Sequence, residues 1–191
     1  MTRNDDLLIG NQLIKPGETL DFSLKISESV LGTSISLPIK VVRSSNKGPI
    51  ILILAGIHGD EMNGVGIVRD LMLKPPKLLN GSLILLPIVN IFGFEENSRY
   101  LPDRRDLNRC FPGKKSGALG SRLAFLVSNE IIQKCTGVID LHTGAFPRTN
   151  FPQIRADLSN PEVKALATAF NTALTLDTKG ELTTLRNWAS R

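Results

Sequence analysis

Three largely apolar runs constrain the fold of this 191-residue chain more than any other feature. They are "IILILAG" at residues 50–56, "GSLILLPIVN" at 81–90 and "GVIDLHTG" at 137–144. Runs without polar alternation are typical of strands that are covered on both faces, as in parallel sheets. The sequence therefore predicts a buried sheet with helices on both sides of it.

Segments with helical spacing separate these runs, as a layered α/β fold requires. Residues 62–72 form one such segment, which Pro75-Pro76 ends, and residues 119–135 form a second. Asn160 followed by Pro161 is a good helix start, and the final "GELTTLRNWASR" at 180–191 predicts one more helix. Residues 91–118 are predicted to be a long polar loop.

Two earlier segments alternate polar and apolar residues, "LDFSLKIS" at 20–27 and "SISLPIKVV" at 34–42. This alternation predicts an antiparallel strand pair that leads into the sheet. We therefore expect an α/β fold with a mixed, mostly parallel central sheet in a single domain. Residues 1–45 would supply the N-terminal strands and residues 46–191 the main part of that domain.

The charge pattern favours small ligands over nucleic acid. The net charge is +5, and the basic residues occur singly or in pairs, whereas a nucleic-acid site needs a denser basic face. The pattern suits small anionic substrates, or it is an ordinary solvated surface. Cys110 and Cys135 have no metal-binding spacing, and we expect reduced thiols in a cytoplasmic protein with neither a signal peptide nor a membrane span.

The only two histidines both lie where a predicted strand ends. His58 follows the first buried run, with Glu61 three residues later across a turn to which Gly59 would give conformational freedom, and His142 ends the third run. Two imidazoles and one carboxylate suit a zinc site that keeps a fourth position for water. A single histidine at a strand end is more often structural, so spacing alone leaves the metal and structural interpretations open.

The predicted loop is rich in arginine. Arg99, Arg104, Arg105 and Arg109 lie within eleven residues, and Asn108 precedes the last of them. Arginine grips carboxylates with two parallel hydrogen bonds, and asparagine can add a donor and an acceptor. Surface arginines are usually solvated charges, but a loop that leaves the carboxyl end of a strand could hold a substrate carboxylate.

Three motifs resemble the succinylglutamate desuccinylase/aspartoacylase family, which belongs to the zinc carboxypeptidase-like group. They are "AGIHGDE", "RYLPDRRDLNRCFPG" and "VIDLHTG", and the resemblance spans roughly residues 20 to 190. It implies a three-layer α/β/α fold and a zinc-dependent hydrolase that cleaves the amide bond of an N-acyl amino acid.

The resemblance also assigns site residues. It implies one zinc ion per chain on His58, Glu61 and His142, a substrate carboxylate on Asn108 and Arg109, and a catalytic Arg99 that polarises the scissile carbonyl. Asp140 would orient a ligand or be a buried structural acid paired with an arginine. Members of the family also use a glutamate, on a strand after the helix that closes this chain, to activate water.

No residue here matches that glutamate, and we interpret Glu181 as an acid in the first turn of the last helix. We therefore expect a chain that is truncated at its C-terminus, binds metal and hydrolyses poorly. Two alternatives remain, a non-catalytic metal- or ligand-binding remnant and a basic interaction protein without metal. The expected partner is a small anionic N-acyl amino acid, with no nucleic acid, no membrane and a possible homo-oligomer.

Overall fold

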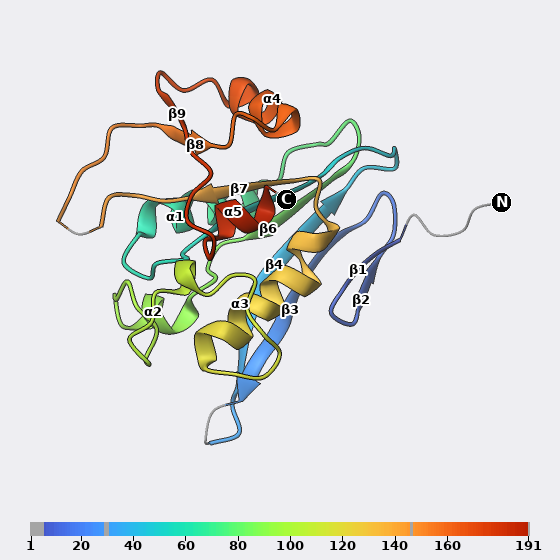
Figure 1. Ribbon diagram of the computed structural model, residues 1–191. Helices are drawn as coiled ribbons and strands as arrows, with labels where there is room; N and C mark the ends of the chain where they lie inside the picture. Colours follow the sequence, from blue (N-terminus) through green and yellow to red (C-terminus); the bar gives the residue numbers. More distant parts are fainter. Residues whose placement is uncertain (1–5, 29–30, 146, 191) are drawn as a thin grey trace.

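The computed structural model describes residues 6–28, 31–145 and 147–190. Among these residues, the main sheet has five strands in the spatial order β3-β4-β6-β5-β7 (Figure 1). The strands are β3 (Thr19–Glu28), β4 (Ser34–Arg43), β5 (Ile50–Ala55), β6 (Ser82–Leu86) and β7 (Gly137–Leu141). All three apolar runs therefore form strands of this sheet, although the run at 81–90 is a strand only in its first half.

The sheet is mixed, as predicted. Strands β3 and β4 are antiparallel, and so are β4 and β6, whereas β5 is parallel to both β6 and β7. The alternating segments thus make the antiparallel side and the apolar runs make the parallel side. Because β5 lies between β6 and β7, the carboxyl ends of these three strands meet at one edge of the sheet.

Helices lie on both faces of the sheet (Figure 1). Leu52 and Leu54 of β5 belong to a core that includes Leu123 of helix α3 (Leu119–Glu130). Ala55, one residue further along β5, belongs to a second core with Val65 of helix α1 (Met62–Leu73). Successive side chains of a strand point to opposite faces, so β5 needs apolar residues at every position.

Helix α1 ends at Leu73, before Pro75-Pro76, as predicted. The second predicted helix is shorter than expected, because α3 ends at Glu130 and is followed by the 3₁₀ helix η2 (Ile132–Lys134). Helix α4 (Pro161–Phe170) begins as predicted, with the side chain of Asn160 accepting hydrogen bonds from two backbone amides of its first turn.

The last helix is much shorter than the sequence suggested. Helix α5 covers only Leu185–Ala189, and the hydroxyl of Thr184 caps it by accepting from the amide of Asn187. Gly180 has φ of +73°, which stops a helix from starting there. The interpretation of Glu181 as an acid in the first helical turn is therefore wrong, since Glu181 precedes the cap.

The segment 91–118 is less irregular than predicted. It contains helix α2 (Ile91–Glu95) and the 3₁₀ helix η1 (Leu107–Arg109). Leu101, Leu107 and Phe111 are almost completely buried in the core that α3 covers. These three apolar side chains hold the arginine-bearing part of the segment against the domain, so its polar groups have defined positions.

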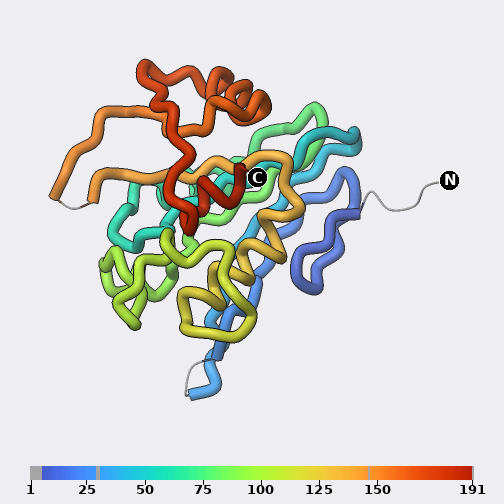
Figure 2. Tube along the Cα trace, viewed as in Figure 1, coloured from blue at the N-terminus to red at the C-terminus, as the bar shows by residue number. Residues whose placement is uncertain are grey.

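Four short strands lie outside the main sheet in the described part of the chain. Strands β1 (Leu7–Ile9) and β2 (Gln12–Ile14) form an antiparallel pair, and β8 (Ile154–Ala156) pairs in parallel with β9 (Thr175–Asp177). Helices α4 and α5 both contact β7, and after β9 the chain returns towards the segment that carries η1 (Figure 2).

No helix in the described part of the chain combines the length and apolar character that a membrane span requires.

Candidate metal centre

The turn between β5 and α1 places the first two candidate ligands. Gly56 has φ of +62°, and its carbonyl accepts from the amide of Asn90, so the chain turns directly after the strand. The conformational freedom expected of Gly59 is in fact needed at Gly56. Gly59 has a different role, because a Cβ there would overlap the backbone of Gly93 in α2.

The neighbouring strand supplies the third candidate ligand. Ala55 of β5 pairs with Leu141 of β7, so His142 emerges beside the turn that carries His58. The centroids of the two imidazole rings are 5.0 Å apart. Parallel pairing thus brings together two histidines that are 84 positions apart in the sequence.

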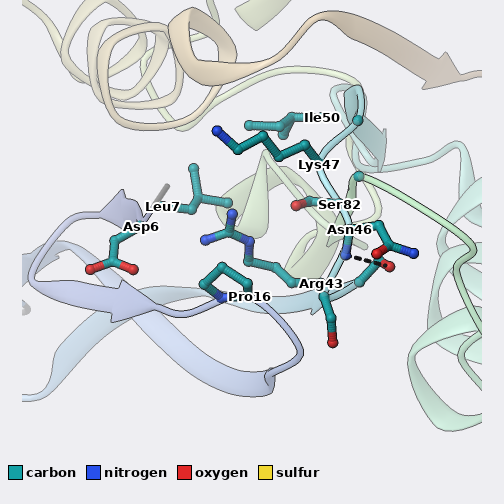
Figure 3. A pocket seen from close by; sticks show the side chains of 12 residues that line it. Asp6, Leu7, Pro16, Arg43, Asn46, Lys47, Ile50 and Ser82 are labelled. Atoms are coloured by element: carbon teal, nitrogen blue, oxygen red, sulfur yellow. Dashed lines mark hydrogen bonds between the residues drawn. The ribbon is translucent and has the colours of Figure 1, made fainter. Parts of the chain in front are cut away.

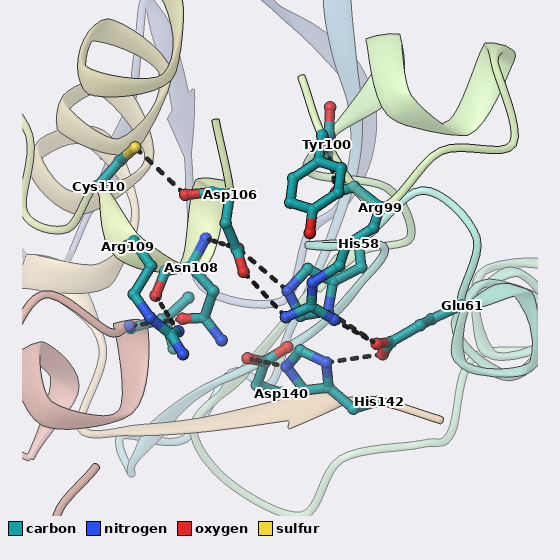
Figure 4. Close-up of polar contacts among 12 residues, drawn as sticks. His58, Glu61, Arg99, Tyr100, Asp106, Asn108, Arg109, Cys110, Asp140 and His142 are labelled. Carbon is teal, nitrogen blue, oxygen red and sulfur yellow. Dashed lines mark hydrogen bonds and ion pairs between the residues drawn. The ribbon is translucent and has the colours of Figure 1, made fainter. Parts of the chain in front are cut away.

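Glu61 lies between the two imidazoles (Figure 4). Its Oε1 is 2.7 Å from Nδ1 of His58, and its Oε2 is 2.7 Å from Nδ1 of His142. The amide of Thr143 also donates to Oε2, at 3.0 Å. One candidate donor atom from each of the three side chains lies within 4.8 Å of the other two. Both Nδ1 atoms therefore face the same small volume.

Each imidazole ring also contacts one further carboxylate through its other nitrogen, Nε2. Oδ1 of Asp106 is 3.2 Å from Nε2 of His58, and Oδ2 of Asp140 is 2.8 Å from Nε2 of His142 (Figure 4). Histidines that bind metal usually donate their other N–H to such a partner, which fixes the ring and its tautomer. Of the two interpretations of Asp140, the geometry favours the one that orients a ligand.

The sequence did not single out Asp106. Its carboxylate caps η1 by accepting from the amide of Asn108 at 2.8 Å, in addition to its contact with His58. A capping signal was present, because an aspartate stands two residues before the asparagine in "DLNR". The contact with His58, which is 48 positions away, depends on the path of the segment and could not be read from spacing.

The carboxylates and imidazoles of the cluster shift each other's pKa values. Burial by itself would raise the pKa of Glu61, but hydrogen bonds from His142 and His58 outweigh it and hold this pKa well below its ordinary value. Burial would lower the pKa of His142, but the carboxylates of Asp140 and Glu61 raise it to about 10. The pKa of His58 is likewise raised, against burial, by Asp106 and Glu61. The three carboxylates therefore favour positive charge between them.

The residues present fit a zinc ion. Two imidazole nitrogens and one carboxylate oxygen are a usual three-ligand set for zinc with an open position. Bonds of about 2.0–2.1 Å in a tetrahedral site place neighbouring ligand atoms about 3.3 Å apart. The shortest donor contacts here are 2.7 Å and no pair exceeds 4.8 Å, so small side-chain movements would satisfy that geometry.

Arg99 reaches the same cluster from the segment after α2. Its Nη2 donates to Oδ2 of Asp106 at 2.9 Å, and its Nη1 lies 3.3 Å from Nδ1 of His58 and 3.6 Å from Oε1 of Glu61. Arg99 therefore places a positive guanidinium at the edge of the donor set, where it can donate to an oxygen that binds there.

Asn108 and Arg109 lie on η1, which Asp106 connects to His58. Arg109 is partly exposed and pairs with Glu181, with Nε to Oε2 at 2.9 Å. The side chain of Asn108 accepts from the amide of Leu185 at 3.0 Å. Asn108 and Arg109 follow Asp106 closely in the sequence. In the described interactions, neither contacts the donor atoms of the three candidate ligands.

The other two arginines of the predicted clamp have a different place. Arg104 is exposed, and Arg105 is exposed and pairs with its neighbour Asp103 at 3.6 Å. Neither contacts the candidate ligands or Asn108 in the described interactions. Of the four arginines of this segment, only Arg99 contacts the candidate ligands, and only Arg109 contacts Asn108, in the described interactions.

A cavity of about 310 Å³ lies at the opposite end of the parallel strands (Figure 3). Ile50 and Ser82, the first residues of β5 and β6, line it together with Arg43 and Lys47. It contains none of the predicted site residues. The candidate metal centre instead lies at the carboxyl edge, where ligand sites of α/β sheets usually form.

The fold and the site together define an α/β protein with a candidate two-histidine, one-glutamate metal centre at the carboxyl edge of a mixed sheet. Residues 47–189 match the family model described as the succinylglutamate desuccinylase/aspartoacylase catalytic domain. The chain belongs to this family, as its three motifs indicated.

Individual relatives agree with this assignment. The N-alpha-acetyl-L-2,4-diaminobutyric acid deacetylase of Halomonas elongata is 29% identical over 127 residues, which are 65% of this chain and 36% of that protein. A succinylglutamate desuccinylase/aspartoacylase from Rhodobacter sphaeroides is 28% identical, with a TM-score of 0.76 over 90% of this chain and 53% of that one.

An aspartoacylase family protein from Mesorhizobium loti is also 28% identical, with a TM-score of 0.73 over 84% of this chain. The alignments to these two solved structures each cover 53% of the relative's chain. The chain thus spans about half the length of those relatives, and it matches about a third of the curated deacetylase.

Proposed function

We propose that the chain binds one zinc ion through His58, Glu61 and His142 and forms part of an amidohydrolase that cleaves N-acyl amino acids. The observation that carries this proposal is the convergence of both Nδ1 atoms on the carboxylate of Glu61 in a member of this family. The relative named as a deacetylase of an N-acetylated amino acid supports the substrate class. A cytoplasmic location, which the reduced thiols suggested, is part of the same proposal.

The residues of this chain have separate roles in the proposed reaction. Arg109 and Asn108 hold the α-carboxylate of the substrate, and Arg99 donates to the acyl carbonyl oxygen and stabilises the negative charge that develops on it. A zinc ion held by His58, Glu61 and His142 would supply Lewis-acid chemistry, polarising the carbonyl and lowering the pKa of a water molecule. Asp106 and Asp140 keep both imidazoles in the orientation that the ligand set requires.

Neither Asp106 nor Asp140 suits the role of general base. Each already contacts a histidine Nε2, and Asp106 also contacts Arg99. Burial by itself would raise the pKa of Asp106, but His58 and, to a smaller extent, Arg99 outweigh it and lower this pKa. A base needs a pKa near the working pH and access to the proton. We therefore propose that this chain hydrolyses slowly by itself. Because the carboxylates of Asp106 and Asp140 are already bound to other side chains, they also favour a second candidate function, which is the non-catalytic binding of metal and carboxylate.

An activity assay separates these two functions. The zinc-loaded chain is incubated with acetyl-, succinyl- and formyl-amino acids, and the released amine is measured, with His58→Ala as the blank. Zinc-dependent release above that blank supports the hydrolase. Full zinc loading without any release on all three substrate types supports the binding function and contradicts catalysis by this chain.

Removing the second carboxylate from either histidine is expected to weaken zinc binding without abolishing it. Asp106→Asn and Asp140→Asn should each lower zinc affinity by about 10- to 100-fold, as changes of such partners do in other metal sites. Competition with a chromophoric chelator measures the affinity, and exposed Asp70→Asn is the matched control. Affinities equal to that of the control would show that these contacts do not support the ligands.

Replacing Arg109 should affect substrate and spare metal. Arg109→Gln is expected to weaken binding of an N-acetyl amino acid by about 10- to 100-fold, since hydrogen bonds to charged groups contribute about 1.5–3 kcal/mol. Zinc stoichiometry should stay unchanged. Arg105→Gln, which removes an exposed charge from the same segment, is the control. Loss of zinc in Arg109→Gln would contradict this separation of roles.

A further inference from the structure

Glu181 holds Arg109 in the way that a carboxylate ligand would. Nε of Arg109 is 2.9 Å from Oε2 of Glu181, and Nη2 is 3.1 Å from Oε1. Two nitrogens of one guanidinium thus face two oxygens of one carboxylate, which is the two-point geometry by which arginine recognises carboxylates. The other end of the guanidinium is also engaged, since Nη1 donates to the carbonyl of Asn108 at 2.9 Å.

The backbone around Glu181 is fixed against η1 and the residues after it. The amide of Phe111 donates to the carbonyl of Thr183 at 3.1 Å, and the amide of Leu185 donates to the side chain of Asn108 at 3.0 Å. The carbonyl of Glu181 accepts from both the amide and the hydroxyl of Thr184, at 3.0 and 2.7 Å. The segment 181–185 is therefore docked on Asn108 and its neighbours, and it presents the carboxylate of Glu181 to Arg109.

We propose that Glu181 occupies the position of the substrate α-carboxylate on Arg109 and must leave it before substrate binds. The inference rests on the proposed function, because it takes Arg109 as the residue that receives the substrate carboxylate. Glu181 thereby determines how tightly this chain binds carboxylates, through competition within the same molecule. Asn108 is part of the same arrangement, since its side-chain oxygen is already used by the docked segment.

The exposure of the pair sets the size of the effect. The side chain of Glu181 is 69% exposed and that of Arg109 is 44% exposed. Exposed ion pairs contribute about 0–1 kcal/mol, so the contact competes weakly and opens readily. A receptor that is partly occupied by its own chain loses apparent affinity in proportion to the occupied fraction. Removing the competitor should therefore tighten carboxylate binding by about two- to five-fold.

The test compares two ligands that differ in one charge. N-acetylglycine and its primary amide are titrated calorimetrically into the zinc-loaded chain, its Glu181→Gln and Glu181→Ala variants, and the control Glu162→Gln. Glu162 is exposed in the first turn of α4, so the control removes the same charge at a residue with no described contact to Arg109. Both Glu181 variants should bind the acid about two- to five-fold more tightly than the wild type does. The amide should bind equally to all of them.

A purely structural ion pair would give another result. If Glu181 only stabilises the segment, its variants bind the acid with unchanged or lower affinity, and this result overturns the proposal. An equal gain for acid and amide, or the same gain in Glu162→Gln, also overturns it. A second measurement follows the Nε–H signal of Arg109 by NMR. The signal should shift in one direction when N-acetylglycine is added to Glu181→Ala. It should shift in the same direction between Glu181→Ala and the wild type, in which Glu181 is present.

Failure of this inference and failure of the proposed function can be told apart. Zinc binding and amine release are measured on the same protein and involve His58, Glu61 and His142. If zinc binds and amine is released while the Glu181 variants bind acid like the wild type, only the competition is wrong. If acid binding tightens as expected while no amine is released from any substrate, the competition stands and the hydrolase is wrong.

Discussion

His58→Ala is expected to lower the zinc affinity of the chain by about 100-fold. Structural zinc sites contribute about 10–16 kcal/mol from four ligands, so that each ligand accounts for about 3 kcal/mol, or about 100-fold. His58 is 4% exposed and is held by Glu61 and Asp106 on its two ring nitrogens, so alanine leaves a buried gap where one candidate donor atom stood. Equilibrium dialysis against a zinc buffer measures the change.

Arg109→Gln serves as the control for this measurement, because it removes a charge from the same region without removing a candidate ligand. Its zinc affinity should equal that of the wild type. A thermal melt without zinc should show that His58→Ala is still folded, so that lost affinity reflects the missing imidazole. Equal zinc affinities in His58→Ala and the wild type would remove His58 from the ligand set.

Gly59→Ala is expected to destabilise the chain by about 3 kcal/mol, at the upper end of the usual cost of overpacking. The added Cβ would overlap the carbon and oxygen of Gly93 and the amide nitrogen of Phe94, which are backbone atoms that cannot turn away. The amide of Gly59 also donates to the carbonyl of Ser98 at 3.0 Å. Ser98 lies just beyond α2, and its own amide donates to the carbonyl of Gly93 at 2.8 Å, so moving α2 away would disturb a contact that holds the ligand-bearing turn.

Gly66→Ala is the matched control for this substitution. Gly66 lies in α1, and a Cβ there would have no heavy atom within 4 Å. Alanine should therefore stabilise the chain by about 0.5–1 kcal/mol, through its better helix propensity. Urea unfolding measures both variants. A Gly59→Ala chain that is as stable as Gly66→Ala would show that the turn and α2 are not packed as described.

The fold was most predictable where one local pattern decided it. The apolar run at 50–56 contains a strand covered on both faces, as predicted, since β5 contributes residues to both cores. The run at 137–144 was predicted to be buried in the same way, but β7 is the edge strand of the described sheet and all five of its residues are only half-buried. The segment 91–118 was harder, because Leu101, Leu107 and Phe111 follow no helical or strand period. Their burial depends on contacts with distant parts of the chain, so sequence spacing could not show it.

The end of the chain shows how a local signal can mislead. The pattern of residues 180–191 suggested one helix, but the hydroxyl of Thr184 caps a helix that begins only at Leu185, and Gly180 has a left-handed conformation. Glu181 therefore lies outside the helix and pairs with Arg109, which is 72 positions away. The local pattern correctly indicated a helix near the end of these residues, but the partner of Glu181 depends on the tertiary fold.

The candidate site divides in the same way. His58, Glu61 and His142 could be grouped from the sequence because each follows a predicted strand and parallel strands end at one edge. Asp140 could be suspected, since it stands two residues before His142 in the same predicted strand. Asp106 could not, because its contact with His58 requires the segment after α2 to fold back over the turn.

X-ray absorption at the zinc edge tests the central claim most directly, once the stoichiometry has been determined. We predict one zinc ion per chain, with two imidazole nitrogens and a carboxylate oxygen at about 2.0–2.2 Å and no sulfur ligand. Less than about half an equivalent of zinc after mild purification and zinc dialysis would contradict the claim. A sulfur ligand at about 2.3 Å would contradict it equally, because it would place the metal on Cys110 or Cys135.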